Sequence, residues 1–270
     1  MVDLFRKSHK RGENVRAVPA SARIYAALRE QILTMEVIPG TALQEKQIAS
    51  TYGVSRTPVR EALLKLGDER LVEIFPQYGT FVSRISLPEV RDAMLIRQAL
   101  ERAAVRQAAE RIDAAGEAEL NTILAHQRAT HEAGRLGDFY TADEIYHQAI
   151  SEIAGHPNLW RVIRQEKAQV DRCRILTLPA AERRASVIRE HEVVTAALVK
   201  HDPDAAEAAM HAHLGRVLPS VEALVAAHPS YFYAEAGEAD AAAAPLAAIP
   251  PGFARESDAP GLSETRTRTR

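Results

Sequence analysis

The chain has 270 residues, the length of about two domains of ~100–200 residues each, and 46% are hydrophobic but only 5% aromatic, which favours helices over sandwiches or barrels. The single cysteine, Cys173, excludes an internal disulfide, and the longest uncharged apolar run, Ala241–Ala254, is interrupted by prolines, so it does not reach the ~18 residues of a membrane span. The net charge of -2 is uneven: residues 1–86 hold 13 of the 34 Lys and Arg and 9 of the 36 Asp and Glu. This either reflects chance or indicates that the first third binds a polyanion. The first residues include no signal-peptide-like apolar stretch, so we expect a cytoplasmic protein.

The N-terminal third begins with residues 1–19, a basic segment without apolar periodicity that we predict to be disordered. Apolar residues from Ser21 onward predict a helix that ends before Pro39. A second short helix runs from Leu43 to Gly53, and a third follows Ser55, which is a favourable N-cap residue.

Two β-prone runs, residues 71–75 and 80–83, follow the third helix and are separated by a turn signal at 76–79. Three short helices and a hairpin predict a winged helix-turn-helix domain over residues 20–84.

The second domain is predicted to start at a capping box, Ser86 to Glu89, and to span residues 85–228. We expect six helices there, joined by short loops into an antiparallel bundle. Their expected spans are 88–110, 114–134, 138–154, 157–176, 180–201 and 203–226. The fold class is therefore mainly α, and residues 234–270, rich in Ala, Gly, Pro and Glu, are predicted to be a disordered tail.

The start of the third helix carries the residues expected to contact DNA. Arg56 and Arg60 lie one turn apart and share a face, so both can reach bases or phosphates of the major groove. The hydroxyl of Thr57 suits a phosphate oxygen, and Lys46 on the second helix suits a backbone phosphate. Gly79 lets the hairpin tip approach the minor groove. The alternative is that the two arginines form only surface ion pairs, for Arg60 with Glu61 or Glu69.

The run Gly53-Val-Ser-Arg-Thr-Pro-Val-Arg-Glu-Ala-Leu63, followed by Leu71-Val72 and Gly79-Thr-Phe-Val82, resembles the DNA-binding domain of GntR-type bacterial repressors. The resemblance covers about residues 21–84 and implies DNA contacts at the five positions named above. One position differs: the family usually has a glycine before Leu71, where this chain has Arg70. The third helix therefore ends either at Arg70, at a conformational cost, or earlier at Gly67.

Four residues of the second domain have the spacing of a metal site. Asp143 and His147 lie one turn apart on a predicted helix. His191 and His213 are each eleven residues from Asp202, the turn of a predicted helical hairpin, so both lie ~16 Å from that turn at one level. Three imidazoles and a carboxylate suit a divalent metal, Zn first and Ni, Fe or Mn as alternatives.

A lone histidine among the ten of the chain would be assigned a surface or core position, and His211, two residues from His213, points elsewhere on its helix. The set of four is favoured because two independent spacings agree. We expect Tyr146 and Trp160 to be packing residues.

The second domain also resembles the FCD ligand-sensing domain of the FadR subfamily, over about residues 88–226. The resemblance rests on Arg97-x3-Glu101, Asp143-x3-His147, Ala154–Leu159, Glu190-His191 and Met210-x2-His213. It implies that Asp143, His147, His191 and His213 bind a divalent metal whose coordination a small organic acid completes. Six helices rather than seven resemble the VanR-type subgroup.

Three arginines are candidates for binding that acid. The resemblance places Arg97 toward the effector, and the alternative is an ion pair with Glu101 on the same helix. Arg172 and Arg174 lie on one predicted helix, and their spacing allows only one of them to face the cavity.

These observations predict a DNA-binding transcriptional regulator, expected to be a repressor, that binds a palindromic operator as a homodimer and responds to a small carboxylate metabolite. The alternative is a metal-dependent hydrolytic enzyme that uses the three histidines and the aspartate. That alternative leaves the basic winged-helix segment unexplained.

Overall fold

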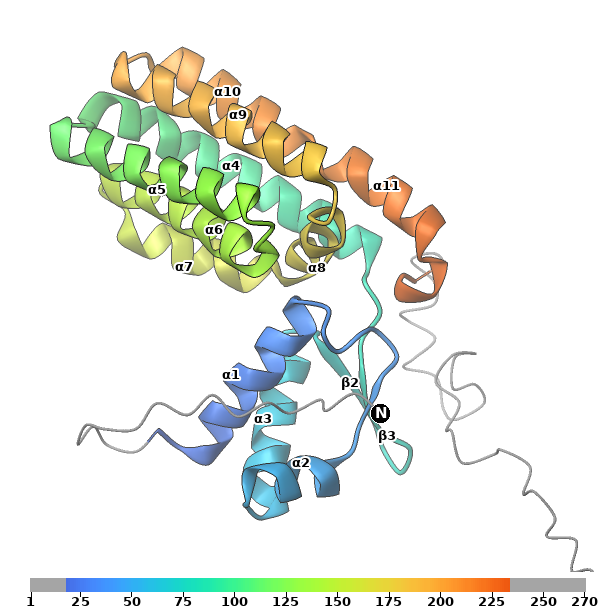
Figure 1. Cartoon of the computed structure of the whole chain (residues 1–270). Coiled ribbons are helices and arrows are strands. Elements are labelled where there is room, and N and C mark those ends of the chain that lie inside the picture. Colours follow the sequence, from blue (N-terminus) through green and yellow to red (C-terminus); the bar gives the residue numbers. More distant parts are fainter. Residues whose placement is uncertain (1–17, 234–270) are drawn as a thin grey trace, which may run out of the picture.

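The computed structural model describes residues 18–233. Residues 1–17 of the predicted arm and the predicted tail 234–270 lie outside the described part of the chain. Two groups of elements are seen in Figure 1: an N-terminal group of short helices and strands, and a larger layered group of helices that begins with α4 (Leu87–Arg111). The predicted mainly helical fold, with a winged helix-turn-helix followed by a helical domain, is confirmed.

The N-terminal group has three helices and a small antiparallel sheet. Its elements are α1 (Ala20–Leu33), β1 (Ala42–Leu43), α2 (Glu45–Tyr52), α3 (Arg56–Asp68), β2 (Val72–Phe75) and β3 (Gly79–Val82). The predicted hairpin pairs Phe75 with Gly79 and Val72 with Val82. The two-residue strand β1, which the sequence pattern did not reveal, pairs with β3 and completes the order β1-β3-β2.

The helix-turn-helix is held together by buried side chains and a sharp turn. Gly53 has a left-handed φ of 65° and ends α2. Ser55 occupies the N-cap position of α3 as expected, but its side chain makes no capping hydrogen bond. The core beneath α3 comprises Ile24, Leu28, Ile32, Ile48, Val59, Leu63, Leu66, Leu71 and Val82.

The end of α3 resolves the question raised by Arg70. The helix ends at Asp68, and Arg70 has a φ of 55°, the left-handed conformation for which glycine is favoured. The Arg70 N–H donates to Gly67 O at 2.8 Å and the Leu71 N–H donates to Leu66 O at 3.0 Å. This pair of bonds is a Schellman motif built on a non-glycine residue.

The helical domain has eight helices instead of the predicted six. After α4 these are α5 (Ala114–Glu132), α6 (Leu136–Ile153), α7 (Pro157–Glu166), α8 (Ala168–Thr177), α9 (Ala181–Val199), α10 (Pro203–Gly215) and α11 (Val217–Ala227), and a 3-10 turn, η1 (Pro229–Tyr231), follows. Of the predicted capping box at the start of α4, the N-cap bond is present, since Ser86 Oγ accepts a bond from the Glu89 N–H, while the Glu89 carboxylate pairs with Arg70.

Two predicted helices are each divided in two. The predicted helix 203–226 is interrupted at Arg216, because Pro219 has no N–H to donate to the carbonyl of Gly215. The predicted helix 157–176 is interrupted at Lys167, which is neither Pro nor Gly. Its ammonium group is buried between Glu144 and Asp171, at 2.7 and 2.6 Å, a tertiary contact that helical periodicity does not reveal.

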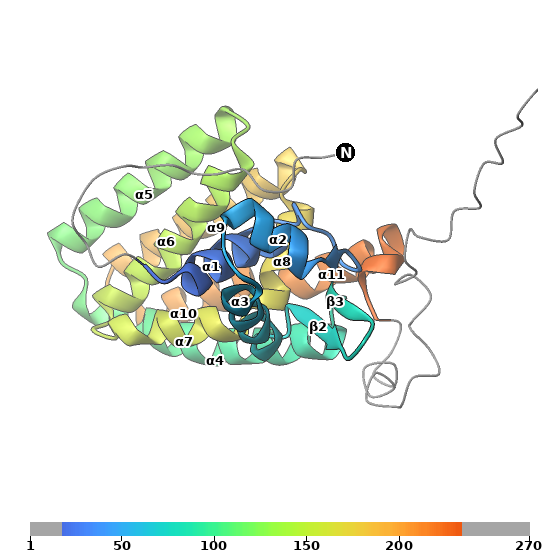
Figure 2. The ribbon, with the colours of Figure 1, turned by 90° about the horizontal axis from the view of Figure 1, so that it is seen from below.

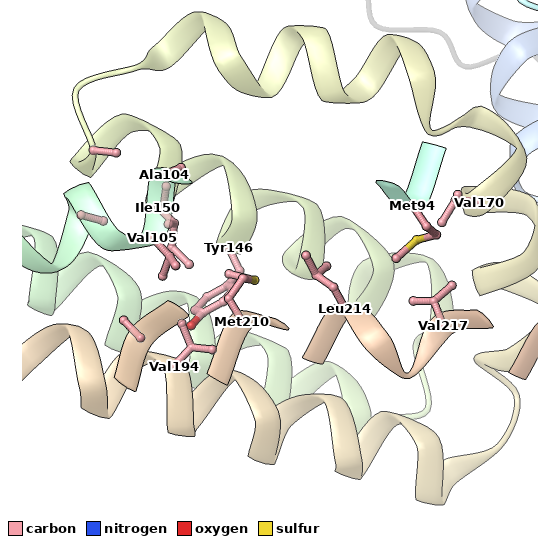
Figure 3. Packing of buried hydrophobic residues seen from close by; sticks show 14 of the residues in the cluster. Met94, Ala104, Val105, Tyr146, Ile150, Val170, Val194, Met210, Leu214 and Val217 are labelled. Carbon is pink, nitrogen blue, oxygen red and sulfur yellow. The ribbon is translucent and has the colours of Figure 1, made fainter. Parts of the chain in front are cut away.

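The core of the helical domain lies between α4, α6, α9 and α10. Figure 3 shows Tyr146 of α6 beside Val194 and Met210, and Met94 of α4 beside Val170 of α8. The winged helix lies against α8 in Figures 1 and 2, and Ala168 of α8 belongs to the buried cluster of the N-terminal group. Among the described residues, no helix combines the length and apolarity of a membrane span.

Candidate metal centre and nucleic-acid interface

The four predicted ligands converge from three helices. Asp143 and His147 project from α6, His191 from α9 and His213 from α10. One ring nitrogen from each of the three histidines lies within 4.8 Å of the others. The carboxylate oxygens of Asp143 lie 3.7 Å from His147 Nε2 and 3.7 Å from His191 Nε2. All four side chains are buried, so the structure assembles the set that the spacing predicted.

The atoms that face one another in this cluster lack hydrogen-bond partners. His147 Nε2, His191 Nε2 and Asp143 Oδ1 are all buried without one. Unsatisfied buried polar atoms are costly, so a cluster of them calls for an explanation. A divalent cation would satisfy these lone pairs together, and imidazoles with a carboxylate are the donor set of Zn, Ni, Fe and Mn sites. The residues therefore fit a metal ion.

The other ring nitrogen of each histidine lies against a polar group of a neighbouring side chain. His191 Nδ1 bonds Gln127 Oε1 of α5 at 3.0 Å, and His213 Nδ1 bonds Glu190 Oε2 at 2.7 Å. His147 Nδ1 lies 2.6 Å from Glu101 Oε2 of α4. Such outer contacts orient metal-binding imidazoles and raise their basicity.

Sequence reasoning assigned no function to these three outer residues. The sequence motifs include Glu101 and Glu190 but assign them no contact with a histidine, and no sequence motif includes Gln127. The available signal for Gln127 was its position on the apolar stripe of α5, one turn after Ile123 and Leu124.

Two aromatic rings fix the imidazole planes. Tyr146 stacks on His191 with ring centroids 4.0 Å apart, and its hydroxyl donates to His191 O. Trp160 of α7 stacks on His147 at 5.7 Å. The expected packing role of both residues therefore includes packing against the histidines of the cluster.

Burial and neighbouring charges shift the pKa values of the cluster toward the protonation states that bind a cation. Burial lowers the pKa of His191 well below its usual value, and it also lowers that of His213. Burial alone would raise the pKa of Asp143, but Arg174 and the three imidazoles outweigh it and hold that pKa well below its ordinary value. The site therefore presents a carboxylate and, at His191 and His213, neutral imidazoles, which are the forms that bind metals.

The three candidate effector arginines occupy different environments. Arg174 is the cation nearest the cluster, since its Nη2 donates to Asp143 Oδ2. Arg97 pairs with Glu101 at 2.7 Å, which is the alternative considered above, but its Nη2 is buried without a partner. Arg172 points to the boundary between the domains, where its Nη2 donates to Ser83 O at 2.6 Å. Of the two arginines on α8, Arg174 therefore lies at the cluster. The prediction of Arg172 as an effector-binding residue is corrected, because its side chain points to the domain boundary.

The residues predicted to contact DNA lie on the surface of the winged helix. Lys46, Arg56, Thr57 and Gly79 are all exposed, and Gly79 has a φ of 124°. Arg60 is also exposed but makes an ion pair, as the alternative held. Its partner is Glu45 of α2 at 2.9 Å, instead of Glu61 or Glu69.

Comparison with known proteins agrees with this division into two domains. Residues 20–82 match the family described as "Bacterial regulatory proteins, gntR family", and residues 92–216 match the "FCD domain". The HTH-type transcriptional repressor RspR of Escherichia coli is 37% identical over 217 residues, which cover 80% of this chain and 95% of that protein.

A second relative, an HTH-type transcriptional regulator of Streptomyces ambofaciens, is 36% identical over 79% of this chain and 89% of its own length. Among solved structures, E. coli McbR/YncC superposes with a TM-score of 0.64 at 23% identity, over 78% of this chain and 99% of that one. This last similarity concerns the fold.

Proposed function

Because this chain belongs to the GntR family of bacterial transcriptional regulators and carries an FCD domain, we propose that it is a repressor whose affinity for operator DNA is set by a metal ion and a small carboxylate in the helical domain. The winged helix supplies DNA binding. Asp143, His147, His191 and His213 hold the metal, which when bound offers a Lewis-acidic position to a ligand oxygen. A relative named as a repressor supports the direction of regulation.

One observation carries the proposal: buried nitrogen and oxygen atoms of α6 and α9 that have no hydrogen-bond partner face one another beside His213 of α10. On the opposite side of the rings, Gln127 and Glu190 bond the other nitrogens of His191 and His213. A merely structural histidine cluster would satisfy its own lone pairs with protein donors. Here the hydrogen bonds lie on the outer side of these two rings.

The carboxylate class of the effector rests on two guanidinium groups. Arg97 Nη2 is buried and unpartnered, and Arg174 already contacts the carboxylate of Asp143. Guanidinium groups bind carboxylates through charge-assisted hydrogen bonds, so a small acid that also reaches the metal would pair with them.

On the DNA side we propose a homodimer that places two copies of α3 in successive major grooves of a palindromic operator. Lys46 and Thr57 contact phosphates, Arg56 and Arg60 contact bases or phosphates, and Gly79 brings the wing toward the minor groove. Such a regulator acts where the chromosome is, in the cytoplasm.

The hydrolytic alternative is not retained, because the family consists of transcriptional regulators and not of enzymes. Membership of the VanR-type subgroup stays a proposal. It rested on a count of six helices, and the structure divides two of those helices.

Metal content tests the site directly. The full chain is freed of metal with a chelator, incubated with Zn²⁺, Mn²⁺ or Ni²⁺, and examined by native mass spectrometry. We expect one metal ion per chain in the wild type and none in His191→Ala. The matched control is His211→Ala, since His211 is an exposed histidine beside the site. Full occupancy in His191→Ala would contradict the proposed ligand set.

DNA binding is then measured for the metal-free and metal-loaded protein, on duplexes selected from a random pool. We expect salt-sensitive, sequence-selective binding. The affinities of the two forms are expected to differ by about fivefold or more, as allosteric coupling between sites typically produces. Equal affinities with and without metal, and with a panel of small carboxylates, would contradict the regulatory role.

A further inference from the structure

The linker between the two domains, Ser83 to Ile85, forms hydrogen bonds with helix α8 on one side. Ser83 and Ile85 are both buried. Arg172 of α8 donates to Ser83 O at 2.6 Å, and Gln169 of the same helix donates to Arg70 O at 3.1 Å. The helical domain thus bonds directly to the backbone at the base of the wing.

Arg172 is unusual because it is buried and, within residues 18–233, no carboxylate forms an ion pair with it. Its side chain is fully buried, and its hydrogen bonds go to the backbone and hydroxyl of Ser83 and to the amide of Gln169, while Nε is unpartnered. Burial lowers its pKa to about 10. A buried cation that makes no ion pair is costly for stability, and the hydrogen bonds to Ser83 and Gln169 offset part of that cost.

On its other side, the linker forms backbone hydrogen bonds with the residues that follow α11. The Ile85 N–H donates to Tyr231 O at 2.8 Å, and the Tyr233 N–H donates to Ile85 O at 3.1 Å. Phe232 is buried in the core of the helical domain. The Tyr233 hydroxyl donates to Glu73 of β2, so residues 231–233 bond both the linker and the wing.

Each of these two sets of contacts is connected through a helix to one residue of the candidate metal centre. Helix α8 also carries Arg174, which contacts Asp143. His213 lies three residues before Arg216, where α10 gives way to α11, and α11 leads to residues 231–233. In Figures 1 and 2, α8 and the end of α11 both lie toward the winged helix.

We propose that residues 83–85, held between Arg172 and residues 231–233, form a clamp that transmits the state of the histidine site to the winged helix. This inference rests on the proposed metal site. A ligand shifts an equilibrium only through different contacts in two states. Here the differing contacts are those of Asp143 with Arg174, and the direction in which α10 holds α11.

Hydrogen–deuterium exchange of the full chain, freed of metal and then given Zn²⁺, tests the clamp. In the wild type we expect Zn²⁺ to slow exchange at the amides of Ser83 and Ile85 by about fivefold or more, together with slower exchange in α6, α9 and α10. In Arg172→Met and in Tyr233→Phe, Zn²⁺ should still bind and protect these helices. The response of the linker should be lost in Arg172→Met. It should be weakened in Tyr233→Phe, which keeps the backbone bonds with Ile85 but loses the bond to Glu73.

Tyr231→Phe is the matched control, because the structure gives the Tyr231 hydroxyl no hydrogen bond within residues 18–233, and the backbone contact with Ile85 remains. It should respond like the wild type. Zn²⁺ that protects α6, α9 and α10 of the wild type without changing the linker would overturn the clamp alone. Unchanged linker responses in both test variants would do the same. Failure of Zn²⁺ to bind the wild type at all would overturn the proposed metal site and the clamp with it.

Discussion

In His191 and His213, the two ring nitrogens have different partners. In each ring Nδ1 is engaged by an acidic or amide oxygen, so the proton resides there and Nε2 is left with a lone pair. This choice of tautomer is what allows a buried histidine to bind a metal. At the scale of the residue, the outer partners therefore matter nearly as much as the ligands themselves.

Gln127→Met is expected to lower the affinity for Zn²⁺ by about 10–100-fold, the usual effect of removing an outer partner of a metal ligand. The substitution keeps the length of a side chain that is 0% exposed but removes the oxygen that accepts from His191 Nδ1. Competition with a chromophoric chelator measures the affinity. Gln148→Met, on the exposed face of α6, is the control and should leave it unchanged. Equal affinities in the two variants would show that Gln127 does not orient His191.

The metal-free protein is expected to lose stability as the pH falls below about 6.5, the ordinary histidine pKa. Burial lowers the pKa of His191 and His213 in the folded chain. Between their folded and unfolded pKa values, the unfolded chain therefore binds more protons than the folded one. This stability is complete above about pH 6.5 and is lost as the pH falls through that range.

Urea unfolding of the metal-free protein between pH 8 and pH 5 measures this loss. His126→Gln is the control, because it removes an exposed histidine and leaves the cluster intact. Its profile should follow that of the wild type. A free energy of unfolding that stays constant down to pH 5 would mean that folding does not lower the pKa of these histidines.

The end of α3 shows how a single residue conflicts with the turn that it must form. The Schellman motif requires a left-handed residue, and Arg70 adopts that conformation at a cost of about 1–2 kcal/mol. Its exposed ion pair with Glu89, at 2.9 Å, offsets little of this cost. The backbone carbonyl of Arg70 accepts bonds from Ser83 and Gln169, and these do not depend on the side chain.

Arg70→Gly is therefore expected to raise the free energy of unfolding by about 1 kcal/mol, since glycine adopts this conformation without the steric cost. Thermal and urea unfolding measure the change. Arg70→Ala removes the same ion pair but keeps the strained conformation, so it should give no gain. If both variants are equally stable, the left-handed conformation does not limit the stability of this helix end.

Local patterns predicted most elements, and the failures have physical causes. Ser86, Gly53 and the hairpin residues carry signals that act within a few positions, so they were readable from the sequence. The break at Lys167 carries no proline or glycine signal, and the ammonium group there pairs with Glu144, which is more than twenty residues away in the chain. The strand β1 has only two residues, and it exists because β3 offers it a partner.

The convergence of the four candidate metal ligands was predictable because regular helices convert sequence distance into height along an axis. Asp143 and His147 lie one turn apart, and His191 and His213 lie at equal distances from one turn. Nothing comparable links Gln127 to His191, since α5 meets α9 by packing between distant segments. Arg172 and Arg174 could not be separated for the same reason. Their directions follow from how α8 lies between the two domains.

At the scale of the whole molecule, the two domains divide chemistry and charge. The basic residues expected to contact DNA lie on exposed surfaces of α2 and α3, whereas the candidate metal centre is buried in the helical domain. The domains meet at α8 and at the segment after α11, so the helical domain bonds directly to the winged helix. In the proposed dimer, these contacts set the distance between two recognition helices.

Operator spacing tests that arrangement. The two copies of α3 should contact half-sites about one helical turn, 10–10.5 base pairs, apart. Inserting five base pairs between the half-sites rotates one of them to the opposite face of the duplex. We expect the affinity to fall about tenfold or more, which corresponds to 1.4 kcal/mol or more, as measured by fluorescence anisotropy. The same five base pairs inserted outside the palindrome should have no effect. If the internal insertion is also tolerated, each chain binds its half-site independently, and the helical domain does not hold the two winged helices in register.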